Sequence, residues 1–191
     1  MSKTSTYLLM FVIGAIVGTA YDFIHLIYGV IVYAHPHFWG ETLWTFPEFG
    51  GVAALGFAGI GALKSRLGAP GVSWKRVFLD GVFLLLAYLT TGVFNGKDLI
   101  VVLVLSAISA IWLVLWWKRG AYRLELIVSV LLGILGPIAE ITLIRAGFFH
   151  YQLSDPIPPW LPLLYFISGP LFVDGSLLLA GPRFDLLPGL R

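Results

Sequence analysis

The sequence predicts an all-α polytopic membrane protein, in which residues 1–191 form one domain built as a bundle of six transmembrane helices. Hydrophobic residues make up 59% of the chain and charged residues 12%, whereas soluble domains average about 45–50% and ~25%. Because a soluble domain of this length leaves about a third of its surface exposed, lipid must cover the excess apolar side chains. The apolar runs also approach the roughly 20 residues that a helix needs to cross a bilayer.

Each apolar run is expected to be one helix. The expected spans cover residues 7–33, 43–63, 77–94, 99–117, 124–148 and 160–180. None shows the two-residue alternation of a barrel strand, so helices are favoured. The first run has no small-residue cleavage site at its end and is longer than a signal-peptide core, so we expect a retained span. The glycines of the second run suit close helix packing.

The basic residues predict the orientation. They gather before the first span, in the second and fourth loops and after the last span: Lys3, Lys64, Arg66, Lys75, Arg76, Lys118, Arg119, Arg123, Arg183 and Arg191. The opposite loops contain only Lys97. By the positive-inside rule both termini are cytoplasmic. Tryptophans near the span ends are expected to be interface anchors; these are Trp39, Trp44, Trp74, Trp116, Trp117 and Trp160.

Several functional classes are disfavoured. A net charge of +2 without a basic block does not indicate a nucleic-acid partner. With no cysteine, the chain has neither a disulfide nor a thiolate metal site. The four histidines lack the spacing of a zinc protease, and no nucleotide-binding or nucleophile motif is present. We therefore expect no enzyme, no cofactor and no metal.

Ionisable residues inside spans cost about 2.5–3.5 kcal/mol on insertion scales, which makes each a functional candidate. Asp22 and His25 share one helix face, where they can satisfy each other or serve a ligand or a proton relay. Glu140 follows Gly136-Pro137, and it is expected to face protein or a polar cavity and, when protonated, to donate to a carbonyl freed by the proline.

Three further charges are given structural interpretations. Asp174 is expected to pair with a donor on a neighbouring helix. Arg145 is expected to extend to the head groups, and Asp80 to be an interfacial charge beside the basic loop.

Prolines that follow a glycine within a span or stand near the start of a span predict a cavity. Pro47, Pro137 and Pro170 bend their helices and leave irregular backbone that must line a cavity or be covered by protein. Because the surrounding residues are mostly apolar, the expected guest is an apolar molecule with a small polar head, a lipid rather than an ion or a sugar.

The ordered motifs resemble the Insig family of sterol-sensing membrane proteins, in a prokaryote-type form. The matching segments run in order from about residue 44 to 178: Trp44-Thr45-Phe46-Pro47 with Gly51, Arg66-Leu67-Gly68-Ala69-Pro70, Ala107-Ile108-Ser109 through Trp116-Trp117, Gly147-Phe148-Phe149-His150-Tyr151, Trp160-Leu161-Pro162 and Gly169. The chain departs from the family in its lack of cysteines and in Leu89-Thr90-Thr91, which replaces a polar Asn-His segment.

The resemblance implies six spans, cytosolic termini and a sterol or another single lipid bound within the bundle. In animals it also implies a partner role toward Scap and a sterol-synthesis reductase, and Asp98 stands where the family's partner-binding aspartate would be. The expected membrane is the cytoplasmic membrane of a bacterium or the endoplasmic reticulum of a eukaryote.

Together these observations predict a non-enzymatic lipid sensor or partner-binding regulator that binds a sterol or a diacylglycerol-like lipid. The expected lipid-binding residues are Asp22, His25, Phe46, Pro47, Gly51, Leu55, Gly136, Pro137, Glu140, Phe166 and Gly169. A homo-oligomer is expected, with dimer and trimer both open. The alternatives are a scaffold, and a small membrane enzyme or proton-coupled transporter that uses Asp22, His25, Glu140 and Asp174.

Overall fold

The structure, a computed structural model, describes residues 3–68, 71–119 and 123–180. Its helices are α1 (Lys3–Ile27), α2 (Thr45–Leu67), α3 (Trp74–Val93), α4 (Asp98–Arg119), α5 (Arg123–Arg145) and α6 (Leu161–Ala180). All six are long and apolar enough to cross a membrane, which confirms the predicted bundle. Arg183 and Arg191 of the charge pattern, and Ala69-Pro70 of one motif, lie outside the described residues.

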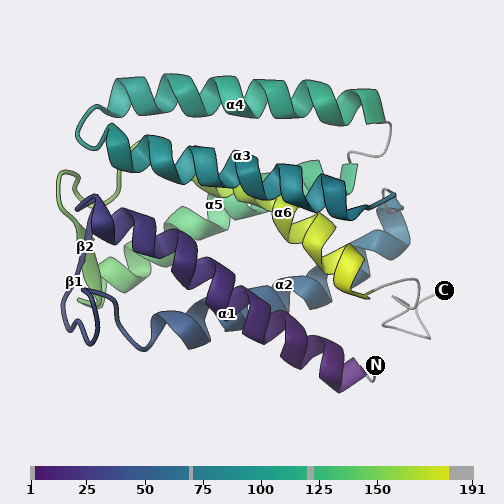
Figure 1. The fold of residues 1–191 in the computed structure, drawn as a ribbon, viewed down its shortest axis with the longest axis horizontal. Helices are drawn as coiled ribbons and strands as arrows, with labels where there is room; N and C mark the ends of the chain where they lie inside the picture. Colours follow the sequence, from purple (N-terminus) through teal and green to yellow (C-terminus); the bar gives the residue numbers. More distant parts are fainter. Residues whose placement is uncertain (1–2, 69–70, 120–122, 181–191) are drawn as a thin grey trace.

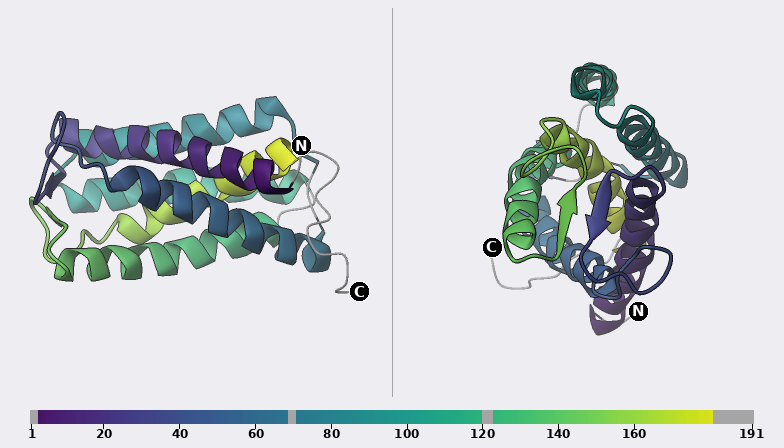
Figure 2. Two further views of the ribbon diagram at one scale, coloured as in Figure 1. Left: turned by 90° about the horizontal axis from the view of Figure 1, so that it is seen from below. Right: turned by 90° about the vertical axis from the view of Figure 1, so that its left-hand side faces the viewer.

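The helices run roughly along one axis, with the connecting segments at the two ends (Figure 1). α1 packs mainly against α2, and α5 against α6, while α4 lies at the outside beside α3 (Figures 1 and 2). α6 contacts each of the other five helices. The described chain begins and ends at the same end of the bundle (Figure 1), as an even number of spans requires.

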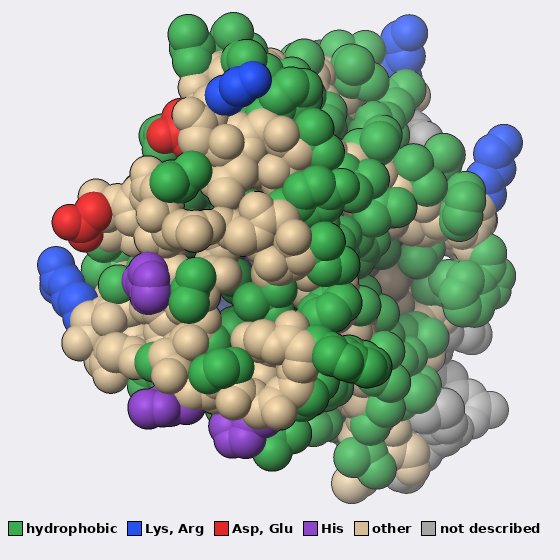
Figure 3. Space-filling model, turned by 60° about the vertical axis from the view of Figure 1, so that its left-hand side comes forward, with side chains coloured by type: hydrophobic (Ala, Val, Ile, Leu, Met, Phe, Trp, Pro, Cys, Tyr) green, Lys and Arg blue, Asp and Glu red, His purple; other side chains and the backbone are tan. Residues whose placement is uncertain are grey.

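The outer surface of the helices is apolar. Hydrophobic side chains cover the flank of the molecule, and charged and histidine side chains gather at its ends (Figure 3). Leu8, Leu55 and Leu103 are exposed by 63%, 76% and 61%. Such a continuous apolar surface is far larger than the patches that soluble monomers expose. An apolar surface of this extent is expected where helices face lipid.

A two-stranded antiparallel sheet replaces the expected ends of the first and fifth spans. Strand β1 (Ile31–Tyr33) pairs with β2 (Phe149–Tyr151), and the strands lie across one end of the bundle (Figure 2). The prediction that these helices extend to residues 33 and 148 is wrong. Both helices stop just before a glycine with positive φ, Gly29 at 64° and Gly147 at 79°, a conformation that ends helices readily. Hydropathy does not distinguish buried strand residues from a continuing span.

An ion cluster joins three helices at the end opposite the sheet. Arg76 of α3 contacts Glu125 of α5 and Asp174 of α6, and all three side chains are buried. The prediction that Asp174 pairs with a donor on a neighbouring helix is confirmed. Arg76 is part of this cluster rather than of the loop, because α3 begins at Trp74. Asp80 is also buried, so its interpretation as an interfacial charge is wrong.

Five of the six predicted anchor tryptophans fall into two groups, and the sixth, Trp44, is half-buried. Trp39, Trp74 and Trp117 are strongly exposed, as anchors would be, but Trp116 and Trp160 are almost completely buried. For these two the anchor interpretation is wrong. Trp160 packs at the start of α6 against His25 and Tyr151, so its indole is part of the core that supports the sheet.

Two glycines let α1 and α2 approach closely. A side chain at Gly14 would collide with Ala53, and one at Gly18 would collide with the ring of Phe49. The first-span Gly-x-x-x-Gly pattern therefore serves packing between helices of one chain, as small residues do in membranes.

The charge distribution predicts which loops face the cytoplasm. Because the chain has no cysteine, Lys97→Cys and Lys118→Cys each introduce a single exposed thiol at opposite ends of the bundle. A membrane-impermeant maleimide added to intact spheroplasts should label Lys97→Cys at once and Lys118→Cys only after permeabilisation. The reverse labelling order would contradict the orientation.

The ion cluster should be necessary for stability. Arg76→Met leaves Glu125 and Asp174 buried without their cation, and breaking a buried pair in this way costs about 3–5 kcal/mol. Thermal unfolding in detergent, followed by tryptophan fluorescence, should show a much lower midpoint for Arg76→Met. Lys75→Met is the matched control, since Lys75 is an exposed neighbour. Equal midpoints for the two variants would contradict a stabilising cluster.

Candidate functional site

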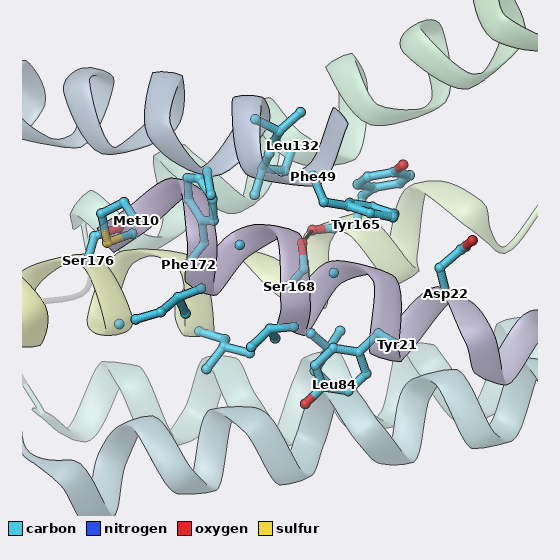
Figure 4. Close-up of a pocket in the computed structure, with 18 of the residues that line it drawn as sticks. Met10, Tyr21, Asp22, Phe49, Leu84, Leu132, Tyr165, Ser168, Phe172 and Ser176 are labelled. Atoms are coloured by element: carbon cyan, nitrogen blue, oxygen red, sulfur yellow. Dashed lines mark hydrogen bonds between the residues drawn. The ribbon is translucent and has the colours of Figure 1, made fainter. Parts of the chain in front are cut away.

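A cavity of about 370 Å³ lies between α1, α3 and α6, with further wall residues from α2 and α5 (Figure 4). One face of α1 forms a long side of it, through residues that recur at helical spacing: Met10, Ile13, Gly14, Val17, Gly18, Tyr21, Asp22 and His25. None of the described wall residues comes from α4. The cavity therefore lies inside the bundle, on the side of α3 that faces away from α4.

The cavity opens to the surface. Three of its wall residues, Val17, Val52 and Trp74, are exposed by 39%, 49% and 70%. α1 and α3 lie close together near the sheet, where the Tyr21 hydroxyl donates to the Gly81 carbonyl at 2.9 Å. They diverge toward the end that holds the ion cluster (Figure 1). The opening therefore lies within the apolar flank of the molecule.

Most of the wall is apolar. Ile13, Val17 and Leu84 lie on one side and Leu132, Leu171 and Phe172 on the other; Figure 4 shows Leu84, Leu132 and Phe172 around the cavity. These side chains offer contact area and no hydrogen bonds.

Asp22 and His25 form the polar end on the α1 side. The Tyr33 hydroxyl of β1 donates to one oxygen of Asp22. The Nε2 atom of His25 lies 2.9 Å from the Thr91 hydroxyl of α3, and its Nδ1 atom lies 4.0 Å from the other oxygen of Asp22. The sheet and α3 thus hold both side chains in place at the cavity wall.

Glu140 completes the polar end from α5. It accepts hydrogen bonds from Tyr151 of β2 and from Tyr165 of α6, the latter at 2.7 Å. The expectation that it donates to a carbonyl freed by Pro137 is wrong, because two tyrosine hydroxyls reach it instead. A smaller cavity of about 30 Å³ lies between Asp22 and Glu140 under the sheet, and it has room for about one water molecule.

The structure brings three of the expected lipid-binding residues, Asp22, His25 and Glu140, into the wall of the larger cavity. The other eight lie outside the walls of both cavities: Phe46, Pro47, Gly51, Leu55, Gly136, Pro137, Phe166 and Gly169.

The glycines of α5 and α6 explain why the expected positions on these two helices line neither cavity. Gly136 lies against the ring of Tyr165, and Gly169 lies against Ser129. Glycine thus lets α5 and α6 pack tightly where we expected a gap. The cavity forms instead where α1 diverges from α3.

Hydroxyl residues are the part of the site that the sequence did not indicate. Tyr33, Tyr151, Tyr165 and Thr91 hold the ionisable side chains, yet none was singled out. Tyrosine in an apolar run is ordinarily a core or interface residue. The sequence shows eight tyrosines, but which of them reach a buried carboxyl depends on the packing of separate segments.

Asp174 does not join the other three residues of the alternative enzyme or transporter site. It belongs to the ion cluster with Glu125, and on α5 Glu125 lies about four helical turns from Glu140. Among the described residues no group of three or more His, Asp or Glu side chains is placed to hold a metal ion. Asp98 lies in the first turn of α4, remote from the cavity wall.

Comparison with known proteins identifies relatives of the chain. No family model matches its sequence. An INSIG protein homolog of Mycolicibacterium vanbaalenii is 30% identical over 179 residues, which span 87% of this chain and 83% of that protein.

The chain belongs to the Insig family.

Two solved structures of the mycobacterial Insig homolog MvINS, from Mycobacterium vanbaalenii, have the same fold. They superpose with TM-scores of 0.76 and 0.75 at 26% identity, and they cover 94% and 93% of this chain and 96% of theirs. One of them is a cross-linked trimer. The family resemblance noted in the sequence is thus confirmed, and so is the six-helix Insig architecture.

Glu41, in the loop before α2, is a buried acid of this Insig-family chain that lies outside the spans. One of its oxygens accepts from the Thr42 amide at 3.2 Å, and its side chain is fully buried. Burial raises the pKa of Glu41 above its ordinary value, although the Thr42 bond acts in the opposite direction. The folded chain therefore keeps this proton to a higher pH than the unfolded chain does.

Glu41 should make the protein less stable as pH rises. A carboxyl group with a raised folded-state pKa makes its full contribution to stability below the pKa of the unfolded chain. This contribution is lost as the pH rises through the folded pKa, and the free energy of unfolding then falls by at most about 1.4 kcal/mol per pH unit. Glu41→Gln should unfold like the wild type near pH 4 and at a higher temperature than the wild type above that range. Thermal unfolding across pH tests this, with Asp155→Asn, an exposed acid at the same end, as control. A Glu41→Gln curve parallel to that of the wild type would contradict it.

Proposed function

We propose that this Insig-family chain is a non-enzymatic membrane protein that holds one sterol or other neutral lipid, such as a diacylglycerol, between its transmembrane helices. The observation that carries the proposal is the cavity of about 370 Å³, which has apolar walls, an opening in the apolar flank and one polar end. Its volume lies within the roughly 300–1,000 Å³ usual for small-molecule sites.

The charges of the wall favour an uncharged head group. The described wall residues include the carboxyl side chains Asp22 and Glu140 and no Lys or Arg. An anionic phosphate or fatty-acid head would meet these acids with no cation to balance it, at a high cost in a dry site. A sugar would find too few polar partners along the apolar walls. A neutral lipid satisfies both conditions.

Occupancy of the cavity offers a route to sensing. The cavity lies where α1 diverges from α3 and α6, so a bound lipid supports the separated arrangement and an empty cavity favours closure of α1 on α6. A ligand shifts such an equilibrium by its differential affinity for the two states. We propose that the chain acts as a lipid sensor or a partner-binding regulator in this way, with Asp98 on a partner-binding surface.

The trimer of the M. vanbaalenii relative supports a homo-oligomer for this chain, and we propose the trimer over the dimer. The protein would lie in the cytoplasmic membrane of a bacterium or in the endoplasmic reticulum of a eukaryote.

Filling the cavity should remove the lipid. Gly175 lines the cavity, and a side chain built on it meets no atom within 4 Å, so Gly175→Phe places a ring in the space of the ligand without displacing backbone. Native mass spectrometry of the purified protein should show one neutral lipid per wild-type chain, and at least about tenfold less lipid on Gly175→Phe.

Gly59→Phe is the matched control. Like Gly175, Gly59 lies within a membrane helix and has open space around it, but Gly59 is exposed and lies outside the cavity wall. It should retain the lipid at the wild-type level. Equal lipid retention by both variants, or a wild-type protein that neither retains a neutral lipid nor binds a fluorescent sterol or diacylglycerol, would contradict the proposed function.

A further inference from the structure

We propose that the polar end of the cavity selects lipids that carry a free hydroxyl, because the Nδ1 atom of His25 presents a hydrogen-bond acceptor to the ligand. This inference rests on the proposed function and adds the chemical rule by which the site would choose its lipid. It would accept a diacylglycerol or a sterol, and reject the same molecule once its hydroxyl is esterified, methylated or oxidised to a ketone.

Thr91 fixes the tautomer of His25. A threonine hydroxyl has one hydrogen, and Thr91 donates it to the Tyr88 carbonyl at 2.7 Å. In the 2.9 Å contact with the His25 Nε2 atom, Thr91 therefore accepts and the ring donates. A neutral imidazole that carries its hydrogen on Nε2 has none on Nδ1. The Nδ1 atom of His25 is thus an acceptor.

A carboxyl oxygen of Asp22 lies opposite that atom. Tyr33 donates to one of its oxygens, and the other oxygen lies 4.0 Å from the His25 Nδ1 atom. This separation is too long for a hydrogen bond, so no proton bridges the pair. Both side chains belong to the cavity wall. A ligand hydroxyl between them supplies the missing donor, whereas an ether, ester or ketone oxygen supplies only a further acceptor.

Three of the neighbouring hydroxyls in the wall are already used. Tyr21 donates to the Gly81 carbonyl at 2.9 Å, Ser168 to the Tyr165 carbonyl at 2.6 Å, and Tyr165 to Glu140 at 2.7 Å. Figure 4 shows Tyr21, Asp22, Ser168 and Tyr165 at this part of the cavity. Because these hydrogens point to protein acceptors, none of the three remains for the carbonyl of a ligand that lacks a hydroxyl.

The test compares two ligands that differ only in the donor. Purified wild-type protein in detergent is loaded with a fluorescent diacylglycerol, which is displaced by dioleoylglycerol or by its O-methyl ether. The ether should be at least about tenfold weaker, since sites built around a hydroxyl discriminate strongly against analogues that lack it. Equal affinities would overturn the inference and leave the proposed function intact. If neither lipid binds, it is the proposed function that fails.

Two substitutions test the residues behind the selectivity. Asp22→Asn places an amide N–H beside the His25 Nδ1 atom, where it can donate to that atom or to an ether oxygen, so the preference for the hydroxyl over the ether should fall. Thr91→Val removes the acceptor that holds the His25 tautomer, and the ratio of the hydroxyl lipid's affinity to the ether's affinity should fall toward one. Thr91 is a positioning residue that lies outside the cavity wall, and Thr91→Ser, which keeps the hydroxyl, should restore the wild-type ratio.

Controls separate selectivity from folding. Tyr88 also lines the cavity, and Tyr88→Phe removes its hydroxyl near His25. This variant should leave the ratio unchanged; a fall to one would make Tyr88, and not the His25 Nδ1 atom, the source of selectivity. A wild-type ratio in Thr91→Val would also overturn the tautomer argument. Because the readout is a ratio for one protein sample, a loss of folded protein changes both affinities equally and does not imitate the expected result.

Discussion

The absence of water in the hydrocarbon core is the constraint on which this structure depends. Each polar side chain placed there must find its partner within the protein. The chain meets this demand with two clusters at opposite ends of the bundle. Arg76 joins Glu125 and Asp174 at one end, and tyrosine hydroxyls hold Asp22 and Glu140 at the other.

The two clusters explain why a cavity persists between them. The ion cluster holds α3 to α5 and α6, while the contacts of Tyr21 and His25 hold the far end of α1 to α3. α1 packs closely on α2 but diverges from α3 elsewhere. The open space that remains is lined mostly by apolar side chains. Its polar end belongs to the same hydrogen-bond network that stabilises the fold.

The sequence predicted part of this site for a clear physical reason. A charged group within an apolar run is costly, so Asp22, His25 and Glu140 were identifiable as a polar site, and all three lie in the cavity wall. The positions based on proline and glycine lie outside that wall, and glycine allows both a gap and a tight contact. At Gly136 and Gly169 the neighbouring helix fills the space.

By itself the sequence determined the six membrane helices, since insertion of each segment depends on the apolar content of that segment alone. Only the tertiary structure decided where α1 and α5 end, because strand pairing of Ile31–Tyr33 with Phe149–Tyr151 joins residues far apart in the chain. It also decided which partner satisfies each buried group: Arg76 for Asp174, two tyrosines for Glu140 and Thr91 for His25. A hydrogen bond between distant segments depends on their packing, which no local pattern records.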